Sequence, residues 1–281
     1  MAPPECAQYA PGVVESARVI ALDRYFRRIG YEGPAEPTRS VLEALVVGHA
    51  GRVPFENLDI QLGRTIRLDL PSLESKLVVG RRGGYCFEQN SLFAAALREI
   101  GFEVTPLEAR VRLGAGVPLP RTHMTLRVEL PEGPVLSDVG FGASGPLVPV
   151  PFDGAAVTRH GETLRLAAEG SRRVLQRAGP AGWSDLYAVE PEPPLPIDLE
   201  VANHFTSTHP ESRFVVTLTA QLPTPETRHV LRNRSYTVTR GETSEEREIA
   251  SPRELLELLR DVFGLDFPPD TRFRNPAFDA P

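Results

Sequence analysis

Cys86 stands between a double glycine and a run of residues with helical periodicity, an arrangement that can make a thiol nucleophilic. From residue 87 to residue 100, apolar side chains recur at the three- and four-residue spacing of an amphipathic helix. Cys86 is therefore expected at a helix N-terminus, where unpaired N–H groups and the positive end of the helix dipole favour an anion such as a thiolate. Gly83 and Gly84 would leave room for a substrate beside the sulfur. The alternative role is that of a buried structural cysteine.

A histidine and an aspartate farther along the chain supply the partners that such a thiol needs. Residues 123–130 alternate between apolar and polar as in a half-buried strand, with His123 on the polar face. A turn follows, and a second strand over residues 135–139 contains Asp138. A buried aspartate requires a partner for its charge, such as an imidazole. Together the three residues provide the nucleophile, base and orienting carboxylate of acyl transfer through a thioester.

The register of this hairpin decides whether the three residues meet. A symmetric hairpin turning about residues 132 and 133 would set Asp138 opposite Arg127, which is four residues from His123. That offset corresponds to roughly 13 Å along a strand. The triad therefore needs a shifted register or a different strand pairing, and both stay open.

Several ordered segments resemble the arylamine N-acetyltransferase family of bacterial type. The family's Arg-Gly-Gly-x-Cys-x-Glu-x-Asn stretch corresponds to residues 82–90, and its histidine to Thr122-His123. Its aspartate corresponds to the start of Asp138-Val139-Gly140-Phe141-Gly142. Two further segments, Val-Pro-Phe-Glu-Asn-Leu at residues 53–58 and Asn-His-Phe-Thr-Ser-Thr-His-Pro at residues 203–210, also match. The likeness covers about residues 20–265.

This resemblance implies a ping-pong transfer. Cys86 would take an acetyl group from acetyl-CoA as cosubstrate and pass it to an arylamine, arylhydrazine or arylhydroxylamine. His123 would hold the thiol proton and later assist deprotonation of the amine. Asp138 would fix the imidazole tautomer and stabilise its cation. The backbone N–H of Cys86 is a candidate donor to the oxyanion.

The resemblance also implies contact residues for the two substrates. The acceptor ring would lie against Phe55, Phe141 and Phe205, and CoA would contact Thr122, Gly140 and Gly142. For Phe55 and Phe205, a place in the ordinary core stays an alternative. Arg82 and Glu56 are expected to form an ion pair that supports the thiol loop rather than to contact substrate. No metal is expected.

Composition is typical of a soluble enzyme. The chain has 281 residues, of which 41% are hydrophobic, enough to bury a large core. A net charge of −6 offers no basic surface for nucleic acid. Cys6 and Cys86 are the only cysteines, so no disulfide framework is indicated and the reducing cytoplasm is the expected location. No long apolar run or signal-peptide pattern indicates a membrane partner. The number of chains that assemble stays open.

Periodicity predicts an α+β fold in three regions. Helices are expected at 18–29, 41–47, 73–79 and after Cys86; strands at 107–113, 123–130, 135–139, 163–168, 173–177 and 185–189; then a helix at 198–207, strands at 214–222, 228–231 and 235–239, and a last helix capped by Ser251 and ended by Gly264. The resemblance orders these as a helical domain (1–100) carrying the nucleophile, a β-barrel domain (101–196) carrying His and Asp, and an α/β lid (197–281) with an irregular tail. It also implies a papain-like or transglutaminase-like Cys-His-Asp core.

Three other functions could use the same residues. Some bacterial relatives close macrolactam rings by moving a carrier-bound polyketide acyl chain onto an arylamine. A hydrolase or transglutaminase-like enzyme would use the triad with water or a lysine amine as the acceptor. A non-enzymatic protein that binds CoA or an aromatic ligand would retain binding after loss of the thiol.

Overall fold

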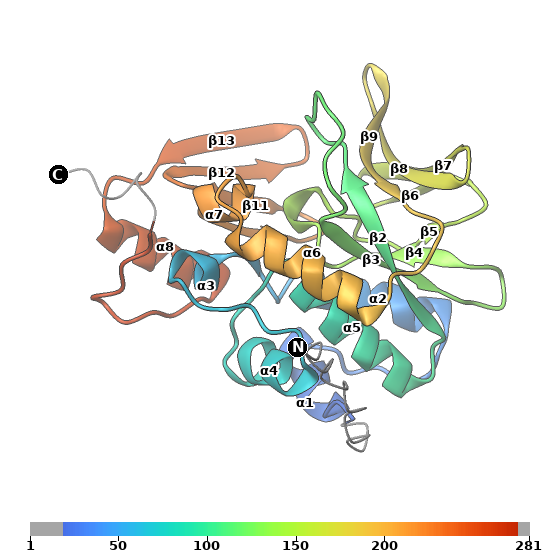
Figure 1. Ribbon diagram of the computed structural model, residues 1–281, viewed down its shortest axis with the longest axis horizontal. Helices are drawn as coiled ribbons and strands as arrows, with labels where there is room; N and C mark the ends of the chain where they lie inside the picture. Colours follow the sequence, from blue (N-terminus) through green and yellow to red (C-terminus); the bar gives the residue numbers. More distant parts are fainter. Residues whose placement is uncertain (1–18, 275–281) are drawn as a thin grey trace, which may run out of the picture.

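Helices dominate the first part of the chain in the computed structural model, which describes residues 19–274 (Figure 1). These are α1 (Leu22–Ile29), α2 (Arg39–Ala50), α3 (Leu58–Gln61), α4 (Leu70–Leu73), a π-helical turn η1 (Glu74–Val79) and α5 (Cys86–Ile100), with a two-residue strand β1 (Phe55–Glu56) between α2 and α3. The helices predicted at 18–29, 41–47 and 73–79 are present with shifted ends, and the last of them is π-helical rather than α-helical. None of the helices in residues 19–274 has the length and hydropathy that a bilayer crossing requires.

Helix α5 begins at Cys86 and ends at Ile100, as the periodicity predicts. At its start, the Glu88 carboxylate accepts a hydrogen bond from the backbone N–H of Tyr85 at 3.1 Å, which satisfies a donor that precedes the first turn. At its end, Gly101 takes the left-handed conformation that closes many helices. The helix is buried along most of its length, and its apolar side chains form the centre of the largest core cluster. The thiol is therefore carried by a rigid element.

Eight antiparallel strands form the second group of elements. They are β2 (Val104–Val111), β3 (His123–Val128), β4 (Val135–Ser137), β5 (Val150–Pro151), β6 (Val157–Arg159), β7 (Glu162–Glu169), β8 (Arg172–Gly179) and β9 (Gly182–Val189). Their order in the sheet is β5-β4-β3-β2-β9-β8-β7-β6. The sheet curls until β5 contacts β7, so the strands form a nearly closed barrel around a core that includes Leu136, Leu175 and Tyr187.

The β3–β4 hairpin has the shifted register that the triad requires. Arg127 pairs with Leu136, and Leu126 pairs with Ser137. Continuing this register by one residue sets Asp138 opposite Thr125, two residues from His123 and on the same face of the ladder. Because six residues, 129–134, connect the strands, the pairing differs from that of a tight symmetric turn. The expectation that Asp138 lies inside the strand is wrong, since β4 ends at Ser137 and Asp138 follows it.

The last part of the chain combines helices with a second sheet. Its elements are α6 (Pro196–Thr208), α7 (Arg213–Val216), β10 (Thr219–Pro223), β11 (Arg228–Arg232), β12 (Ser235–Arg240), β13 (Thr243–Glu248) and α8 (Pro252–Phe263). Helix α8 has the predicted ends: Ser251 accepts from the N–H of Glu254, and Gly264 is left-handed. The sequence did not predict β13, because all six of its residues are exposed and polar, without alternation.

The prediction of one strand over residues 214–222 is wrong. Residues Arg213–Val216 form helix α7, and β10 starts only at Thr219. The physical reason is a local cap: the hydroxyl of Ser212 accepts a hydrogen bond from the N–H of Phe214. The apolar run Phe214-Val215-Val216 favours a strand by propensity, and the cap together with tertiary contacts overrides it.

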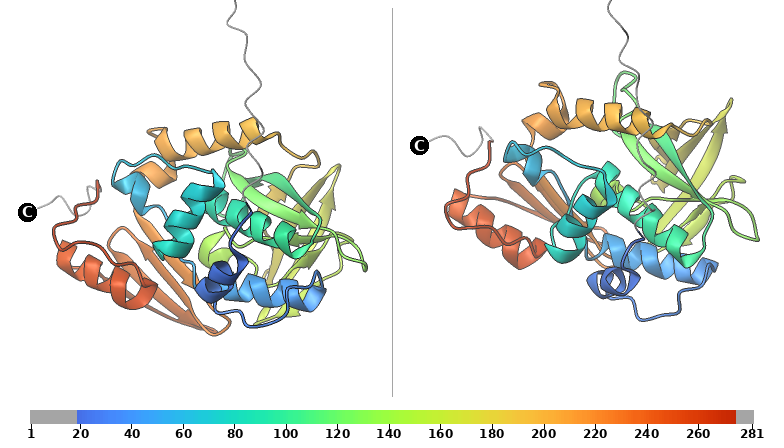
Figure 2. Two further views of the ribbon diagram at one scale, coloured as in Figure 1. Left: turned by 90° about the horizontal axis from the view of Figure 1, so that it is seen from below. Right: turned by 60° about the horizontal axis from the view of Figure 1, so that its bottom comes forward.

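Strand β1 joins the early helices to the C-terminal sheet, whose order is β1-β10-β11-β12-β13. Phe55 pairs with Gln221 on one side and forms an isolated parallel bridge with Gly84 on the other. Figure 2 shows the result: α5 lies in the middle of the molecule, with the barrel on one side and the C-terminal sheet and α8 on the other. The predicted domain boundaries at residues 100 and 196 stay a prediction.

Gly83 lies where the loop before Cys86 packs closely against the chain at Pro54 and Glu56. A Cβ atom on Gly83 would lie 1.9 Å from the carbonyl oxygen of Pro54 and 2.8 Å from Cγ of Glu56. On Gly84, a Cβ would lie 2.7 Å from a carboxylate oxygen of Glu88. The double glycine thus allows close packing of the loop, in addition to any room that it leaves for a substrate.

We expect Gly83→Ala to lower the free energy of unfolding by at least about 2 kcal/mol, because the added methyl group overlaps the backbone of Pro54, the residue before β1. Gly116→Ala is the matched control. A Cβ at Gly116 meets nothing within 4 Å, so the change should stay within about 0.5 kcal/mol. Urea unfolding followed by circular dichroism measures both. Equal stability of the two variants would contradict the packing role of Gly83.

Candidate active site

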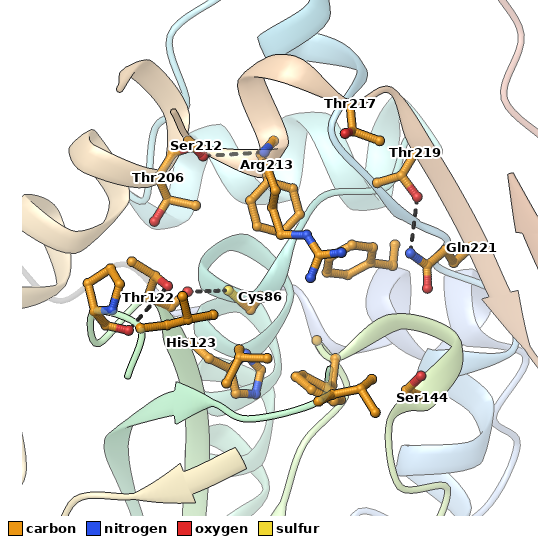
Figure 3. A pocket seen from close by; sticks show the side chains of 18 of the residues that line it. Cys86, Thr122, His123, Ser144, Thr206, Ser212, Arg213, Thr217, Thr219 and Gln221 are labelled. Carbon is orange, nitrogen blue, oxygen red and sulfur yellow. Dashed lines mark hydrogen bonds between the residues drawn. The ribbon is translucent and has the colours of Figure 1, made fainter. Parts of the chain in front are cut away.

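The N-terminus of α5 places Cys86 at the wall of a cavity of about 370 Å³ (Figure 3). Only 2% of the Cys86 surface is exposed. In the thiol form, Sγ donates to the carbonyl oxygen of Thr122 at 3.6 Å. No other free cysteine occurs in residues 19–274, and Cys6 lies outside the described residues. The cavity gives a small molecule access to this otherwise buried sulfur.

His123 and Asp138 form a direct buried pair beside this sulfur. Nε2 of His123 lies 2.7 Å from Oδ2 of Asp138. The other ring nitrogen, Nδ1, is then the one that can serve Cys86, and a hydrogen bond between the two side chains contributes to the protonation of His123. The expectation that His123 lies on a polar strand face is wrong. Both faces of β3 are buried rather than one. One face packs against α5, and the face that carries His123 and Thr125 is covered by the barrel.

The electrostatics of the pair favour an imidazolium beside a carboxylate. Burial by itself would lower the pKa of His123, but the charge and hydrogen bond of Asp138 and the contact with Cys86 outweigh it and raise the pKa to about 10. Burial would raise the pKa of Asp138, yet His123, Asn90 and Tyr187 together hold it below its usual value.

Four hydrogen bonds fix the Asp138 carboxylate. Oδ2 accepts from His123 and from the hydroxyl of Tyr187, both at 2.7 Å. Oδ1 accepts from Nδ2 of Asn90 and from the N–H of Gly140, both at 2.9 Å. Asn90 also accepts from the N–H of Val139 at 3.1 Å, which holds the loop after β4 against α5. The orientation of the carboxylate is therefore set by three separate elements as well as its own loop.

Sequence reasoning did not assign roles to Asn90 and Tyr187. Asn90 follows Cys86 by four residues, so the two side chains lie on the same face of α5, and this spacing could have indicated the role of Asn90. No signal in the sequence points to Tyr187, which comes from β9 and reaches Asp138 only because the barrel closes.

The cavity brings together most of the residues that the sequence singled out. It is lined by Cys86, Thr122, His123, Gly140 and the three phenylalanines Phe55, Phe141 and Phe205. Asp138 and Gly142 are absent from the lining. Asp138 lies behind His123, and Gly142 packs against Gln221.

The three phenylalanines differ in their surroundings. The Phe141 ring centroid lies 4.8 Å from that of His123, so Phe141 covers the imidazole. Phe55 is 7% exposed and belongs to the core as well as to the cavity wall. Phe205 is 38% exposed, which contradicts a place in the core.

Close packing explains why glycine occupies positions 140 and 142, after Asp138. A Cβ on Gly140 would lie 2.7 Å from Cα of Cys86, so only glycine lets this loop cross the start of α5. Gly142 has a φ of +68°, and a Cβ there would lie 2.5 Å from Oε1 of Gln221. The expectation that these glycines and Thr122 contact CoA stays a prediction.

Sequence reasoning missed the wall that the C-terminal part contributes. Arg213 and Phe214 of α7, and Thr219 and Gln221 of β10, line the cavity opposite the barrel. Gln221 accepts from the N–H of Ala143 at 2.8 Å and so ties β10 to the loop that carries Phe141. The sequence did not indicate this wall, because the predicted strand over residues 214–222 left Arg213 in a loop instead of at the start of helix α7.

A buried ion network supports the start of α5. Arg82 pairs with Glu56 at 2.7 Å, which confirms the predicted ion pair, and also with Asp59 at 3.2 Å. Lys76 of η1 pairs with Asp59 at 2.8 Å and with Glu88 at 2.6 Å. None of these five residues lines the cavity. The network connects η1, α3 and β1 to the first turn of α5.

A cysteine at a helix N-terminus, an imidazole and a buried carboxylate thus lie together beside a small cavity, and these are the residue types that acyl transfer through a thioester requires. The sequence pattern of the N-acetyltransferase family matches residues 39–271. The chain is 39% identical over 253 residues to the arylamine N-acetyltransferase of Mycolicibacterium smegmatis, which covers 87% of this chain and 92% of that protein.

Solved structures agree with this comparison. The arylamine N-acetyltransferase of M. tuberculosis superposes with a TM-score of 0.83 and 40% identity, covering 86% of this chain and 93% of that one. The enzyme of Mycobacterium marinum, solved in complex with CoA, gives a TM-score of 0.81 and 36% identity, covering 86% and 92%. The chain belongs to the arylamine N-acetyltransferase family and is an acyltransferase.

We expect part of the stability of the protein to depend on protonation of His123. Because the folded-state pKa is raised to about 10, this contribution is complete below the unfolded pKa of about 6.5 and is lost as the pH rises through about 10. The free energy of unfolding should therefore fall between pH 6.5 and pH 10 more steeply in the native protein than in His123→Gln. His160→Gln is the control at a surface turn. Identical slopes for the native protein and His123→Gln in urea unfolding would refute this linkage.

Proposed function

We propose that the protein transfers an acetyl group from acetyl-CoA to the nitrogen of arylamines, arylhydrazines or arylhydroxylamines by a ping-pong reaction through an acetyl-Cys86 thioester. The observation that carries this proposal is the buried His123–Asp138 pair beside a cysteine that opens onto an aromatic cavity. Membership of the family supports the choice of acetyl group and arylamine, and the CoA complex of the M. marinum enzyme supports CoA as the carrier.

In the first half-reaction, the Cys86 thiolate attacks the thioester carbonyl of acetyl-CoA. The negative charge that develops on the carbonyl oxygen needs a donor, and the N–H of Cys86 is suited because no helical carbonyl can pair with the first N–H of α5. When the carbonyl re-forms, the bond to the CoA sulfur breaks. His123 gives its proton to that sulfur, so free CoA leaves and the acetyl group stays on Cys86.

In the second half-reaction, the amine nitrogen attacks the acetyl carbonyl of the Cys86 thioester. His123, now neutral, removes a proton from the nitrogen, and the bond to the Cys86 sulfur breaks. The amide leaves, and the thiolate–imidazolium pair is restored. Asp138 holds the ring so that Nδ1 faces the reacting atoms in both halves.

The cavity suits a small aromatic acceptor. Its volume of about 370 Å³ falls within the range of small-molecule sites, about 300 to 1,000 Å³. The Phe55 and Phe214 ring centroids are 5.9 Å apart and form one aromatic wall. A macrolactam-forming amide synthase would have to accommodate a long carrier-bound acyl chain, and no feature of the cavity favours that alternative.

We expect native protein mixed with acetyl-CoA alone to gain one acetyl group at Cys86, and to lose it when an arylamine is added and N-acetylated product forms. Intact-mass spectrometry with peptide mapping measures both steps. Cys86→Ala should gain no acetyl group and should be inactive, with an unchanged circular dichroism spectrum. Substantial turnover by Cys86→Ala would refute the mechanism. A native thiol that alkylates readily but never acetylates would instead indicate a larger carrier-bound donor or a binding protein.

We expect Asp138→Asn to lower kcat by roughly 10² to 10⁴-fold, because the imidazole loses the carboxylate that orients it and stabilises its cation. Loss of the buried charge partner should also lower the melting temperature. Asp153→Asn is the matched control, since Asp153 caps an exposed turn and is not among the residues that line the cavity. A kcat within two-fold of the native value in folded Asp138→Asn would remove Asp138 from the mechanism.

A further inference from the structure

Two arginine side chains at the cavity wall have no counter-ion. Arg213 is the first residue of α7 and Arg232 is the last residue of β11, and both line the cavity. Within residues 19–274, neither guanidinium makes a hydrogen bond or an ion pair. The neighbouring polar side chains differ in this respect: Gln221 donates to Thr219 at 3.0 Å and accepts from the backbone of Ala143. The two guanidinium groups are therefore positively charged groups of this wall that are available to a ligand.

Helix α7, which carries Arg213, is held in place by several contacts. The Ser212 hydroxyl caps α7, and the amide of Asn57 donates to the carbonyl oxygen of Phe214 at 2.7 Å. The Phe214 ring packs edge-on against Tyr85, the residue before the nucleophile, with centroids 5.4 Å apart. Helix α7 is thus held close to the start of α5. Figure 3 shows the Arg213 side chain reaching from this helix into the cavity.

The charge around Arg213 favours an incoming anion. Partial burial and the like charge of Arg232 both lower the pKa of Arg213, and no neighbouring carboxylate among the described residues raises it. Glu211 also lines the cavity, but it forms no ion pair with either arginine among the described residues. With two arginines and one glutamate, this wall carries a net positive charge. An arginine fork binds a carboxylate through two parallel hydrogen bonds.

We propose that Arg213 recognises a carboxylate on the aromatic acceptor, so that the preferred acceptors are arylamines of the aminobenzoate class. This inference rests on the acetyl transfer proposed above and names its acceptor more closely. The adjacency of Arg213 to Phe214 carries the choice of the acceptor over the donor, because one flat ring with a carboxylate would contact both side chains. A carboxylate on the acyl group, as in malonyl-CoA, and the phosphates of CoA are the other sources of negative charge.

The test compares two acceptors of the same shape, 4-aminobenzoate and 4-aminobenzamide, with acetyl-CoA as donor. We expect Arg213→Gln to lower the ratio of their kcat/KM values, benzoate over benzamide, at least ten-fold, and Arg213→Lys to lower it less. Added salt should lower the ratio in the native protein. Arg240→Gln removes the same charge from the end of β12, outside the cavity, and should leave the ratio unchanged. Thermal unfolding confirms that each variant is folded.

Two other outcomes of this comparison overturn the proposal. An equal loss for both acceptors, with a raised KM for acetyl-CoA, would assign Arg213 to the CoA phosphates. A loss confined to malonyl-CoA as donor would assign it to the acyl group. If the native protein acetylates neither amine, the acetyl-transfer proposal fails. Calorimetric titration of donor-free protein with 4-aminobenzoate still tests Arg213 in that case: tight binding that Arg213→Gln weakens at least ten-fold supports the inference, and unchanged or absent binding refutes it.

Discussion

The buried carboxylate of Asp138 is the constraint on which the site depends. A carboxylate that is 1% exposed is stable only if its charge is compensated and its oxygens are hydrogen-bonded. The donors come from β3, β9 and α5 as well as from the loop after β4. All of these elements must be in place before the carboxylate is satisfied. The hydrogen bonds to Asp138 therefore require the closed barrel, the docking of α5 on it and the observed orientation of the imidazole at the same time.

A second buried network holds the start of α5. Lys76 and Arg82 face the carboxylates of Glu56, Asp59 and Glu88. Such a network costs desolvation energy, and removal of one partner would leave a buried charge without compensation. The network is explained by its position, because it holds the first turn of α5, where Cys86 lies. The Glu88 carboxylate also accepts a hydrogen bond from the N–H of Tyr85, the residue before Cys86. Glu88 therefore belongs both to the ion network and to the N-terminal cap of α5.

The cavity lies where three parts of the chain meet. Helix α5 supplies the sulfur, the barrel supplies the imidazole and Phe141, and the C-terminal segment supplies Arg213, Phe214 and Gln221. The three residues proposed to react lie on the first two parts, whereas the third part supplies the opposite wall of the cavity. The residues proposed to react and the residue proposed to select the acceptor therefore come from different parts of the chain.

The sequence by itself determined the elements that local signals specify. The periodicity after Cys86 predicted α5, the capping residues predicted α8, and most barrel strands were predicted within a few residues. The residue types and the family motifs also singled out Cys86, His123 and Asp138 as the reacting set. These features follow from neighbours in the chain, which is why local pattern is enough for them.

Only the tertiary structure decided the rest, because it depends on contacts between distant segments. The two-residue register shift of β3 and β4, the approach of Tyr187 to Asp138, and the short cap that makes α7 a helix are set by packing rather than by local preference. The same holds for Arg213, which has no motif around it. Its place at the cavity wall follows from the pairing of β1 with β10 and from the docking of α7 beside Tyr85.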